Sequence, residues 1–123
     1  MKLNKPKHNL LNNIVYAVEG FIDIVKNETS FKWQLFMLVI MGTIAWSLPI
    51  AFGYSAILFI SLFIPVICEV INSAIERVVD LVTQEYHILA KRAKDVGATI
   101  VLLSFLVTSL IWISVLALAF GIV

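Results

Sequence analysis

The chain has 123 residues, of which 61% are hydrophobic and 14% are charged, and its formal net charge is +1. A soluble domain of this length cannot bury so much apolar surface, so the composition predicts an integral membrane protein. Nine Lys and Arg residues are matched by eight Asp and Glu residues without a long basic run, which argues against a nucleic-acid partner. The length suits a single membrane domain over residues 1–123.

Residues 9–28 show the pattern of an amphipathic helix, because apolar side chains recur at helical spacing and polar side chains fill the opposite face. The apolar positions are Leu10, Leu11, Ile14, Val15, Val18, Phe21, Ile22 and Val25. Since Lys2, Lys5 and Lys7 precede this segment, we expect the helix to lie in the membrane interface with its apolar face toward the acyl chains. A helix packed on a soluble core would show the same pattern, but the apolar segments that follow favour the membrane interface.

Three apolar segments then predict membrane-spanning helices over residues 31–49, 55–75 and 97–119. No charged residue occurs between residues 33 and 68 or after residue 95. At about 1.5 Å per residue, each segment is long enough to cross the hydrocarbon of a bilayer. The predicted fold is therefore an all-α membrane protein with one interfacial helix and three transmembrane helices.

The connecting segments predict the topology. Pro49 and Gly53 mark a turn without charge between the first two spans, which we expect on the side away from the cytoplasm. Residues 76–95 form a charged segment between the second and third spans. Its cations are Arg77, Lys91, Arg92 and Lys94. The positive-inside rule makes this segment cytoplasmic, so the N-terminus is predicted to be cytoplasmic as well. Pro65 is expected to kink the second span.

Four polar residues continue the second span as one stripe. Their spacing puts them on one face of a helix over roughly 16 Å. They are Glu69, Asn72, Glu76 and Asp80. Carboxylates at membrane depth are costly and usually functional. Glu69 is the deepest, and a carboxylate held out of water there is a plausible general base. The alternative is a protonated Glu69 that binds a neighbouring helix, and Asn72 adds a donor and an acceptor directed at the same place.

Two further elements supply charges for phosphate chemistry. Glu76 is expected at the membrane surface, where Glu28 could approach it from the interfacial helix, and two carboxylates are the usual protein share of a Mg²⁺ site. Lys94, followed by Asp95, stands just before the third span, where a lysine can neutralise polyphosphate. The alternatives are solvated helix ends for the two glutamates, and a simple interface anchor for the lysine.

Several nucleotide and hydrolase signatures are absent from the sequence. It contains no Walker A loop, no kinase Gly-rich loop, no Cys/His metal spacing and no nucleophilic Ser or Cys constellation. What remains is a base, two metal-binding acids and a cation at a membrane surface. Phosphoryl transfer to a lipid hydroxyl needs these groups and little else.

The run EVINSAIERVVD from Glu69 to Asp80, with EYH at 85–87 and AKD at 93–95, resembles the bacterial integral-membrane diacylglycerol kinase family. The likeness extends over almost the whole chain. It implies a homotrimer of three-span subunits in the bacterial inner membrane, with active sites shared between neighbouring subunits. It also implies the MgATP-dependent phosphorylation of diacylglycerol to phosphatidic acid.

The resemblance also implies roles for individual residues. Glu69 looks like the proton acceptor for the lipid hydroxyl, and Glu28 and Glu76 look like the Mg²⁺ ligands. Trp112 is similar to a lipid-facing position, so Glu69 and Trp112 are the expected lipid contacts. The positions similar to ATP-contacting ones are Tyr16, Glu28, Asn72, Glu76, Glu85, Tyr86, His87, Lys94 and Asp95.

The chain departs from the family pattern at a few positions. It has Asn9 where well-studied members carry an arginine, Gln34 where they carry a glutamate, and Asn12 where a basic residue is expected. The task of the missing arginine is either lost here or taken over by Lys5 or Lys7. Lipid affinity is therefore carried over less directly than the chemistry.

Three alternatives to diacylglycerol kinase stay open. Undecaprenol offers the same primary hydroxyl on the same fold, and only Ser73-Ala74 and the EYH sequence favour diacylglycerol. A small proton- or ion-conducting oligomer would use Glu69 and Glu76 as a relay, but between Ser55 and Cys68 only Ser61 offers a polar side chain to continue it. An inactive interaction subunit would explain the departures but not the presence of the base, metal and Lys-Asp residues.

Overall fold

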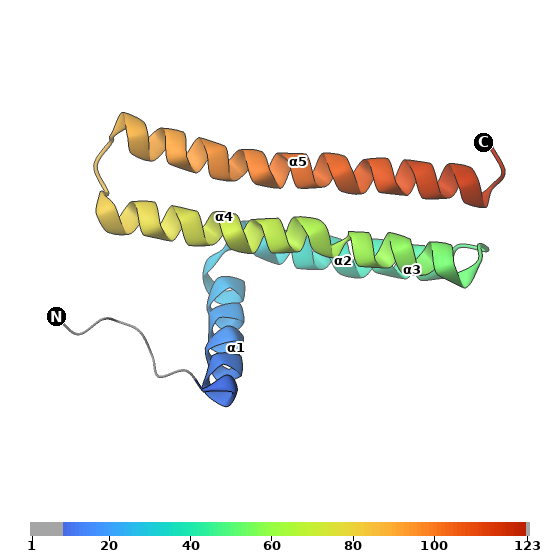
Figure 1. The fold of residues 1–123 in the computed structure, drawn as a ribbon, viewed down its shortest axis with the longest axis horizontal. Helices are drawn as coiled ribbons and strands as arrows, with labels where there is room; N and C mark the ends of the chain where they lie inside the picture. Colours follow the sequence, from blue (N-terminus) through green and yellow to red (C-terminus); the bar gives the residue numbers. More distant parts are fainter. Residues whose placement is uncertain (1–8, 123) are drawn as a thin grey trace.

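The computed structural model describes residues 9–122, and this part of the chain folds into α-helices without any β-strand. The helices are α1 (Leu10–Asn27), α2 (Thr29–Ser47), α3 (Phe52–Ser61), α4 (Phe63–Val82) and α5 (Ile88–Ala119). Helices α2 to α5 run side by side along the long axis of the molecule, whereas α1 extends crosswise from the start of α2 (Figure 1). The described fold is therefore a narrow bundle with one transverse helix.

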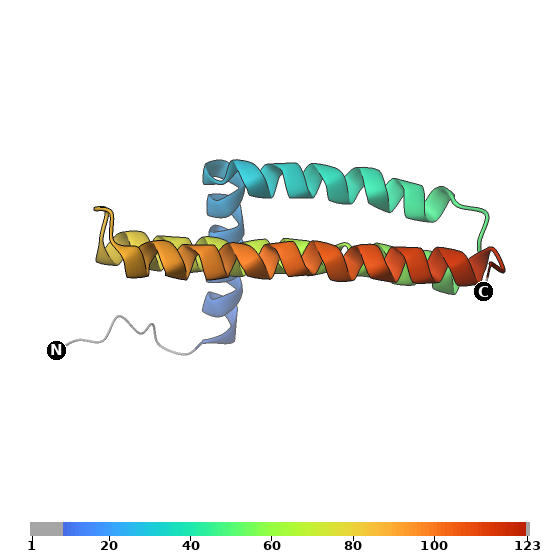
Figure 2. The same cartoon turned by 90° about the horizontal axis from the view of Figure 1, so that it is seen from above.

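Asn9 caps the start of helix α1. The Asn9 Oδ1 accepts a hydrogen bond of 3.1 Å from the backbone N–H of Leu11, which is ordinary N-cap geometry. The apolar positions predicted to face lipid are exposed in the single chain for most of the helix, from Leu10 to Ile22. Viewed along the perpendicular direction, α1 again lies across the other helices (Figure 2), as a helix in the membrane plane would lie against spans that cross it.

A sharp corner joins α1 to α2 at Glu28. This residue ends one helix and precedes the other, and its extended backbone, with φ −105° and ψ 112°, redirects the chain. Ile24 and Phe31 are buried on either side of the corner, and the rings of Phe21 and Phe31 pack edge to face at 5.8 Å between centroids. This packing fixes where the Glu28 carboxylate projects.

The second predicted span is interrupted by its proline. Pro65 has no N–H to offer the carbonyl of Ser61 four residues earlier, and the helix breaks at Leu62 between α3 and α4. The free Ser61 carbonyl instead accepts a hydrogen bond of 3.3 Å from the Thr108 hydroxyl of α5. The break therefore fastens the middle of the bundle to α5.

Two helical stretches in the described part of the chain are long and apolar enough to cross a membrane. They are Phe52–Val82, which joins α3 and α4, and Ile88–Ala119, which is α5. Helix α2 does not reach the same threshold, because Lys32 and Gln34 lie in its first turns. The first predicted span, residues 31–49, therefore corresponds to α2 and lies in the bundle, but it has a more polar start than the other two.

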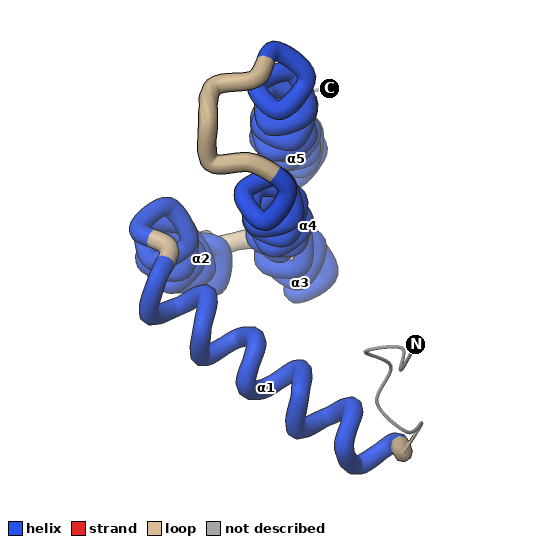
Figure 3. The backbone as a smooth tube through the Cα atoms, turned by 90° about the vertical axis from the view of Figure 1, so that its left-hand side faces the viewer, coloured by secondary structure: helices blue, strands red, loops and turns tan. Residues whose placement is uncertain are grey.

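The charged segment predicted between the spans is largely helical. Helix α4 runs on to Val82 and α5 begins at Ile88, so only residues 83–87 form the connection between them, drawn in tan in Figure 3. At the other end, Pro49 lies in the turn after α2, whereas Gly53 already belongs to α3. The acidic and basic side chains of residues 76–95 therefore stand on two rigid helix ends.

Helix α4 packs against both α2 and α5, and it lies between them when the bundle is viewed from its end (Figure 3). The buried apolar core is small and consists of Ala45, Leu58 and Val115 at the other end of the bundle. Large hydrophobic side chains are exposed along every helix. The isolated chain leaves most of its apolar surface for lipid or for other subunits to cover.

Candidate functional site

The deepest acid of the predicted stripe is buried against α2. Glu69 is only 5% exposed, and its Oε2 accepts a hydrogen bond of 3.0 Å from the Nε2 of Gln34. The polar starting turns of α2 thus lie at the level of the candidate base. Gln34, a polar residue in an otherwise mainly apolar helix, is the side chain that contacts Glu69.

One turn further along α4, two more residues of the stripe contact each other. The Nδ2 of Asn72 donates a hydrogen bond of 3.0 Å to the Oε1 of Glu76, and Asn72 is buried. Its Oδ1 lies against Gly97 of α5 so closely that a Cβ atom at Gly97 would overlap it. The glycine therefore lets α5 approach the amide and holds it in place.

Glu28 is paired with a cation that had no assigned role. The guanidinium of Arg77 donates one hydrogen bond to Asp23 and another, of 3.2 Å, to the Oε1 of Glu28. These two carboxylates raise the pKa of the Arg77 guanidinium above its ordinary value, Asp23 having the larger effect. The cluster joins α1, the corner and α4, and it brings Glu28 next to the residue that follows Glu76.

The lysine and aspartate before the third span have separate partners. Lys94 Nζ contacts the Oδ1 of Asp80 at 2.5 Å, and this ion pair links α5 to the last turn of α4. Asp95 instead accepts from Lys91 at 2.6 Å within α5. Lys94 is therefore placed beside the acidic stripe, with Asp80 as its immediate partner.

The EYH sequence forms the connection between α4 and α5. The Nδ1 of His87 accepts a hydrogen bond of 3.2 Å from the backbone N–H of Leu89 and so caps α5. The backbone N–H of Glu85 donates to the Thr83 hydroxyl at 3.2 Å. Tyr86 is 82% exposed at the tip of the molecule. Tyr16, on α1, is exposed as well, so neither tyrosine is packed against the acidic stripe in the single chain.

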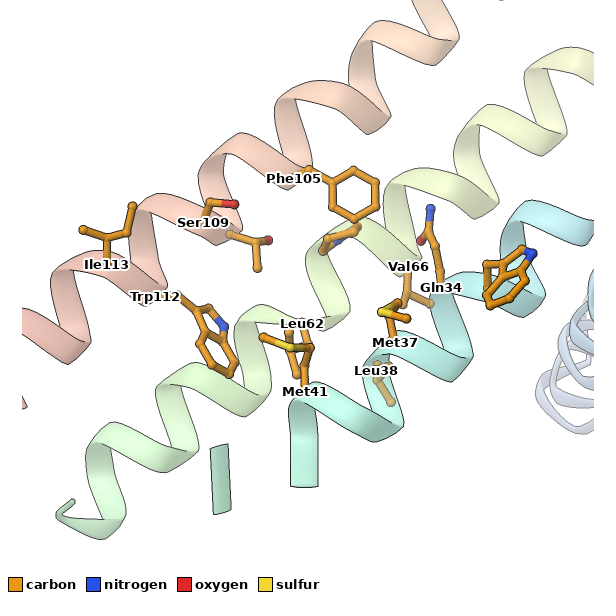
Figure 4. A pocket seen from close by; sticks show the side chains of 13 residues that line it. Gln34, Met37, Leu38, Met41, Leu62, Val66, Phe105, Ser109, Trp112 and Ile113 are labelled. Atoms are coloured by element: carbon orange, nitrogen blue, oxygen red, sulfur yellow. The ribbon is translucent and has the colours of Figure 1, made fainter. Parts of the chain in front are cut away.

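An apolar cavity of about 510 Å³ extends along the bundle between α2 and α5, over the break at Leu62 and the first turn of α4. Figure 4 shows the side chains that line it, with Gln34 toward one end and Trp112 toward the other. The Oε1 of Gln34 and the Nε1 of Trp112 are buried without a hydrogen-bond partner among the described residues. Trp112 lies about 27 Å along α5 from Lys94, so it belongs to the cavity and not to the charged end.

Some of these contacts have a signal in the sequence and some have none. Asp80 lies on the acidic stripe, and Gln34 was recognisable as a departure from the family. Asp23 and Arg77 were missed as a pair, because their residue numbers are far apart and only the corner at Glu28 brings α1 to α4. Lys5 and Lys7, the suggested substitutes for the missing arginine, lie outside the described residues.

The fold and the site together define an all-helical protein of membrane type, with its ionisable residues gathered at one end of an apolar bundle. The family model of the prokaryotic diacylglycerol kinases matches residues 15–116. The chain belongs to the prokaryotic diacylglycerol kinase family, and it is therefore an enzyme of the kinase class.

Similar proteins in three bacteria carry the name diacylglycerol kinase. The chain is 36% identical to the one from Escherichia coli (strain K12) over 106 residues, which cover 86% of this chain and 87% of the relative. It is 31% identical to that of Pseudomonas aeruginosa over 107 residues, which cover 87% of each chain. It is 30% identical to that of Haemophilus influenzae over 104 residues, or 85% of this chain and 88% of the relative.

Proposed function

We propose that this enzyme transfers the γ-phosphoryl group of ATP to the hydroxyl of diacylglycerol, giving phosphatidic acid and ADP. The observation that supports this reaction best is the buried carboxylate of Glu69, whose hydrogen-bond partner Gln34 lines an apolar cavity. A lipid in that cavity can bring its hydroxyl toward the base from the membrane. ATP can approach the same place from the charged end of the bundle.

In this reaction, Glu69 accepts the proton of the lipid hydroxyl. The lipid oxygen forms a bond to the γ-phosphorus, and the bond between that phosphorus and the β-phosphate oxygen breaks as ADP leaves with the electron pair. General-base assistance of this kind is typically worth about 10²- to 10⁴-fold in rate. Asn72 lies about one turn beyond Glu69 on α4. Its hydrogen bond to Glu76 holds the Glu76 carboxylate on the same face of the helix as Glu69.

The residues at the charged end fit a divalent cation and a polyphosphate. Within residues 9–122 no group of three or more His, Cys, Asp or Glu side chains could hold a metal ion by itself. Two carboxylates, Glu28 and Glu76, match the small protein share of a Mg²⁺ site. Glu28 already pairs with one cation, the guanidinium of Arg77. Bound Mg²⁺ would neutralise the charge that develops on the phosphates.

The nucleotide site that we propose uses residues from the α1 helix, the α4 stripe and the start of α5. Its members are Tyr16, Glu28, Asn72, Glu76, Glu85, Tyr86, His87, Lys94 and Asp95. Lys94 supplies positive charge for the phosphates, after exchanging its contact with Asp80 for one with ATP. Trp112, whose indole N–H has no partner in the described part of the chain, is the proposed donor to the lipid within the cavity.

The proposed arrangement in the membrane has α1 in the cytoplasmic interface and three crossings formed by α2, α3 with α4, and α5. The family and the two long apolar stretches indicate a bacterial membrane protein. The exposed apolar faces of the helices support a homotrimer with sites shared between neighbouring subunits. The N-terminus is then cytoplasmic, because the charged residues of 76–95 lie on the same side as α1.

The test is the initial rate of lipid phosphorylation by the purified protein in vesicles that contain diacylglycerol. The wild-type chain is expected to form phosphatidic acid from ATP, and Glu69→Gln, which keeps the shape but removes the base, is expected to lose at least about 10²-fold in kcat. Glu19→Gln, at an exposed glutamate of α1 outside the proposed site, serves as the control. An unchanged rate for Glu69→Gln would exclude the assigned base.

The same assay with undecaprenol in place of diacylglycerol addresses the remaining choice of lipid. We expect the higher kcat/KM with diacylglycerol, and a preference for the polyprenol would transfer the proposal to that alcohol. Membership of a kinase family argues against the ion-conducting oligomer.

A further inference from the structure

Gln34 is the side chain that contacts the candidate base, yet nothing in the proposed reaction has used it. It lies in the second turn of α2, and its carboxamide spans the gap to α4 with a hydrogen bond of 3.0 Å to Glu69 Oε2. Its other polar atom, Oε1, is buried on the cavity side without a partner in the described part of the chain. The carboxamide therefore contacts Glu69 through its nitrogen, and the same side chain lines the cavity (Figure 4).

The direction of this hydrogen bond is fixed by chemistry. An ionised carboxylate only accepts hydrogen bonds, so Gln34 must present its NH₂ group to Glu69 and keep its oxygen turned away. The contact occupies Oε2 of Glu69, and Oε1 of Glu69 is left for the incoming hydroxyl.

The unpaired oxygen of Gln34 points to a ligand. A buried acceptor without a partner is unfavourable, and a donor that enters through the cavity would satisfy it. The hydroxyl of a lipid alcohol is such a donor, and it is also the group that must come within reach of Glu69. The carboxamide can therefore hold the alcohol beside the base before the phosphoryl group arrives.

We propose that Gln34 is a positioning residue, which orients Glu69 with its NH₂ group and receives the hydroxyl of the lipid alcohol with its Oε1. This inference rests on the proposed function, since it takes Glu69 as the base. It assigns a role to a position where the chain departs from its family pattern. A neutral amide donates at every pH, so the orientation of Glu69 does not depend on a shared proton.

The first test replaces Gln34 by methionine, which has a similar length and shape but neither donor nor acceptor. Gln34→Met is expected to lower kcat about tenfold and to raise the KM for diacylglycerol, while the KM for ATP stays the same. Ile40→Met, at an exposed position of the same helix, is the control and should match the wild type. Rates are measured per folded protein, by using near-ultraviolet circular dichroism to determine the folded amount.

The second test uses Gln34→Glu, which keeps the shape and can donate only when it carries a proton. Its kcat should rise toward the wild-type value as the pH falls from about 8 to about 6, because one shared proton restores the donor, whereas the wild type lacks this rise. Few charged groups near Glu69 could interfere. Helix α2 is uncharged after Lys32 and α5 after Asp95, Glu76 lies two turns away on α4, and Glu28 and Asp23 are paired with Arg77.

The outcomes separate the two proposals. An inactive wild type, or a Glu69→Gln variant with full activity, would overturn the proposed reaction and, with it, the role of Gln34. An active wild type with an inactive Glu69→Gln, but with unchanged kcat in Gln34→Met, would leave the reaction standing and refute Gln34 alone. A Gln34→Met variant that yields less folded protein but keeps the wild-type kcat per folded chain would also refute the positioning role of Gln34.

Discussion

At the scale of single residues, Gly97 has the clearest requirement. The Oδ1 of Asn72 occupies the space that a Cβ atom at position 97 would need. We expect Gly97→Ala to displace Asn72, break its hydrogen bond to Glu76 and lower kcat about tenfold or more. The reason is local, because Asn72 is buried and has little room to retreat. The measurement is the phosphorylation rate in vesicles together with thermal unfolding in detergent.

Gly20 provides a matched control for that substitution. It also lies within a helix, but a Cβ atom there would meet nothing within 4 Å. Gly20→Ala should keep full activity and stabilise α1 by about 0.5–1 kcal/mol, through helix propensity alone. If Gly97→Ala and Gly20→Ala had the same kcat, the contact between Gly97 and Asn72 would not contribute to catalysis.

Arg77 makes a second prediction at this scale, because it competes with any metal ion for Glu28. The ion pair is largely exposed, and such pairs contribute about 0.2–1 kcal/mol. Gln at position 77 frees Glu28, so we expect Arg77→Gln to lower the Mg²⁺ concentration for half-maximal binding by roughly 1.4- to 5-fold. Mn²⁺ binding, followed by electron paramagnetic resonance without ATP, measures this directly.

Arg92→Gln removes the same charge from the surface without touching the acids at the corner, so it should leave Mn²⁺ binding unchanged. Weaker binding in Arg77→Gln would mean instead that Arg77 holds Glu28 in place for the metal. The raised pKa of Arg77 also determines how its ion pairs depend on pH. These pairs stabilise the fold fully at any pH below the ordinary pKa of arginine, and this stabilisation is lost only as the pH rises above that value. Deprotonation of Arg77 therefore adds no pH dependence between about pH 7 and 10.

At the scale of elements, the join between α3 and α4 makes a prediction about stability. The Thr108 hydroxyl satisfies the Ser61 carbonyl that Pro65 leaves without its helical partner. Thr108→Val should therefore lower the free energy of unfolding by about 0.5–1.5 kcal/mol. In a Pro65→Ala background the main-chain N–H is restored, so the same substitution should have almost no effect. Unfolding of the four proteins in detergent micelles completes this double-mutant cycle.

Thr99→Val is the control, because the Thr99 hydroxyl only bonds back within α5, to the carbonyl of Asp95. If Thr108→Val lowered the free energy of unfolding equally with Pro65 and with Pro65→Ala, the Thr108 hydroxyl would not be compensating for the hydrogen bond that Pro65 removes.

The elements also show how far the sequence could predict the molecule. Hydropathy and spacing were sufficient for α1, for the apolar segments and for the stripe from Glu69 to Asp80, because these signals lie within single helices. The pairs that assemble the site could not be read in this way. The contacts Gln34 with Glu69 and Arg77 with Glu28 depend on the corner at Glu28 and on which face α2 turns to α4, and these are decided by packing.

At the scale of the whole molecule, the small core predicts association. Only five apolar residues are buried in the described part of the chain, which is too few to hold a bundle of this length rigid, and exposed apolar side chains continue along every helix. We expect a homotrimer in detergent, measured by native mass spectrometry. A mass that corresponds to the monomer at concentrations where the enzyme is active would contradict both the trimer and the shared sites.

The corner at Glu28 has a consequence for the surroundings of the protein. In the proposed membrane arrangement, one proposed metal ligand, Glu28, stands where the interfacial helix α1 meets α2, whereas the other, Glu76, stands within α4. In that arrangement, the separation of these two carboxylates along the membrane normal would change with the thickness of the bilayer. We therefore expect the catalytic rate to depend on bilayer thickness, even in vesicles whose bulk lipid is not a substrate.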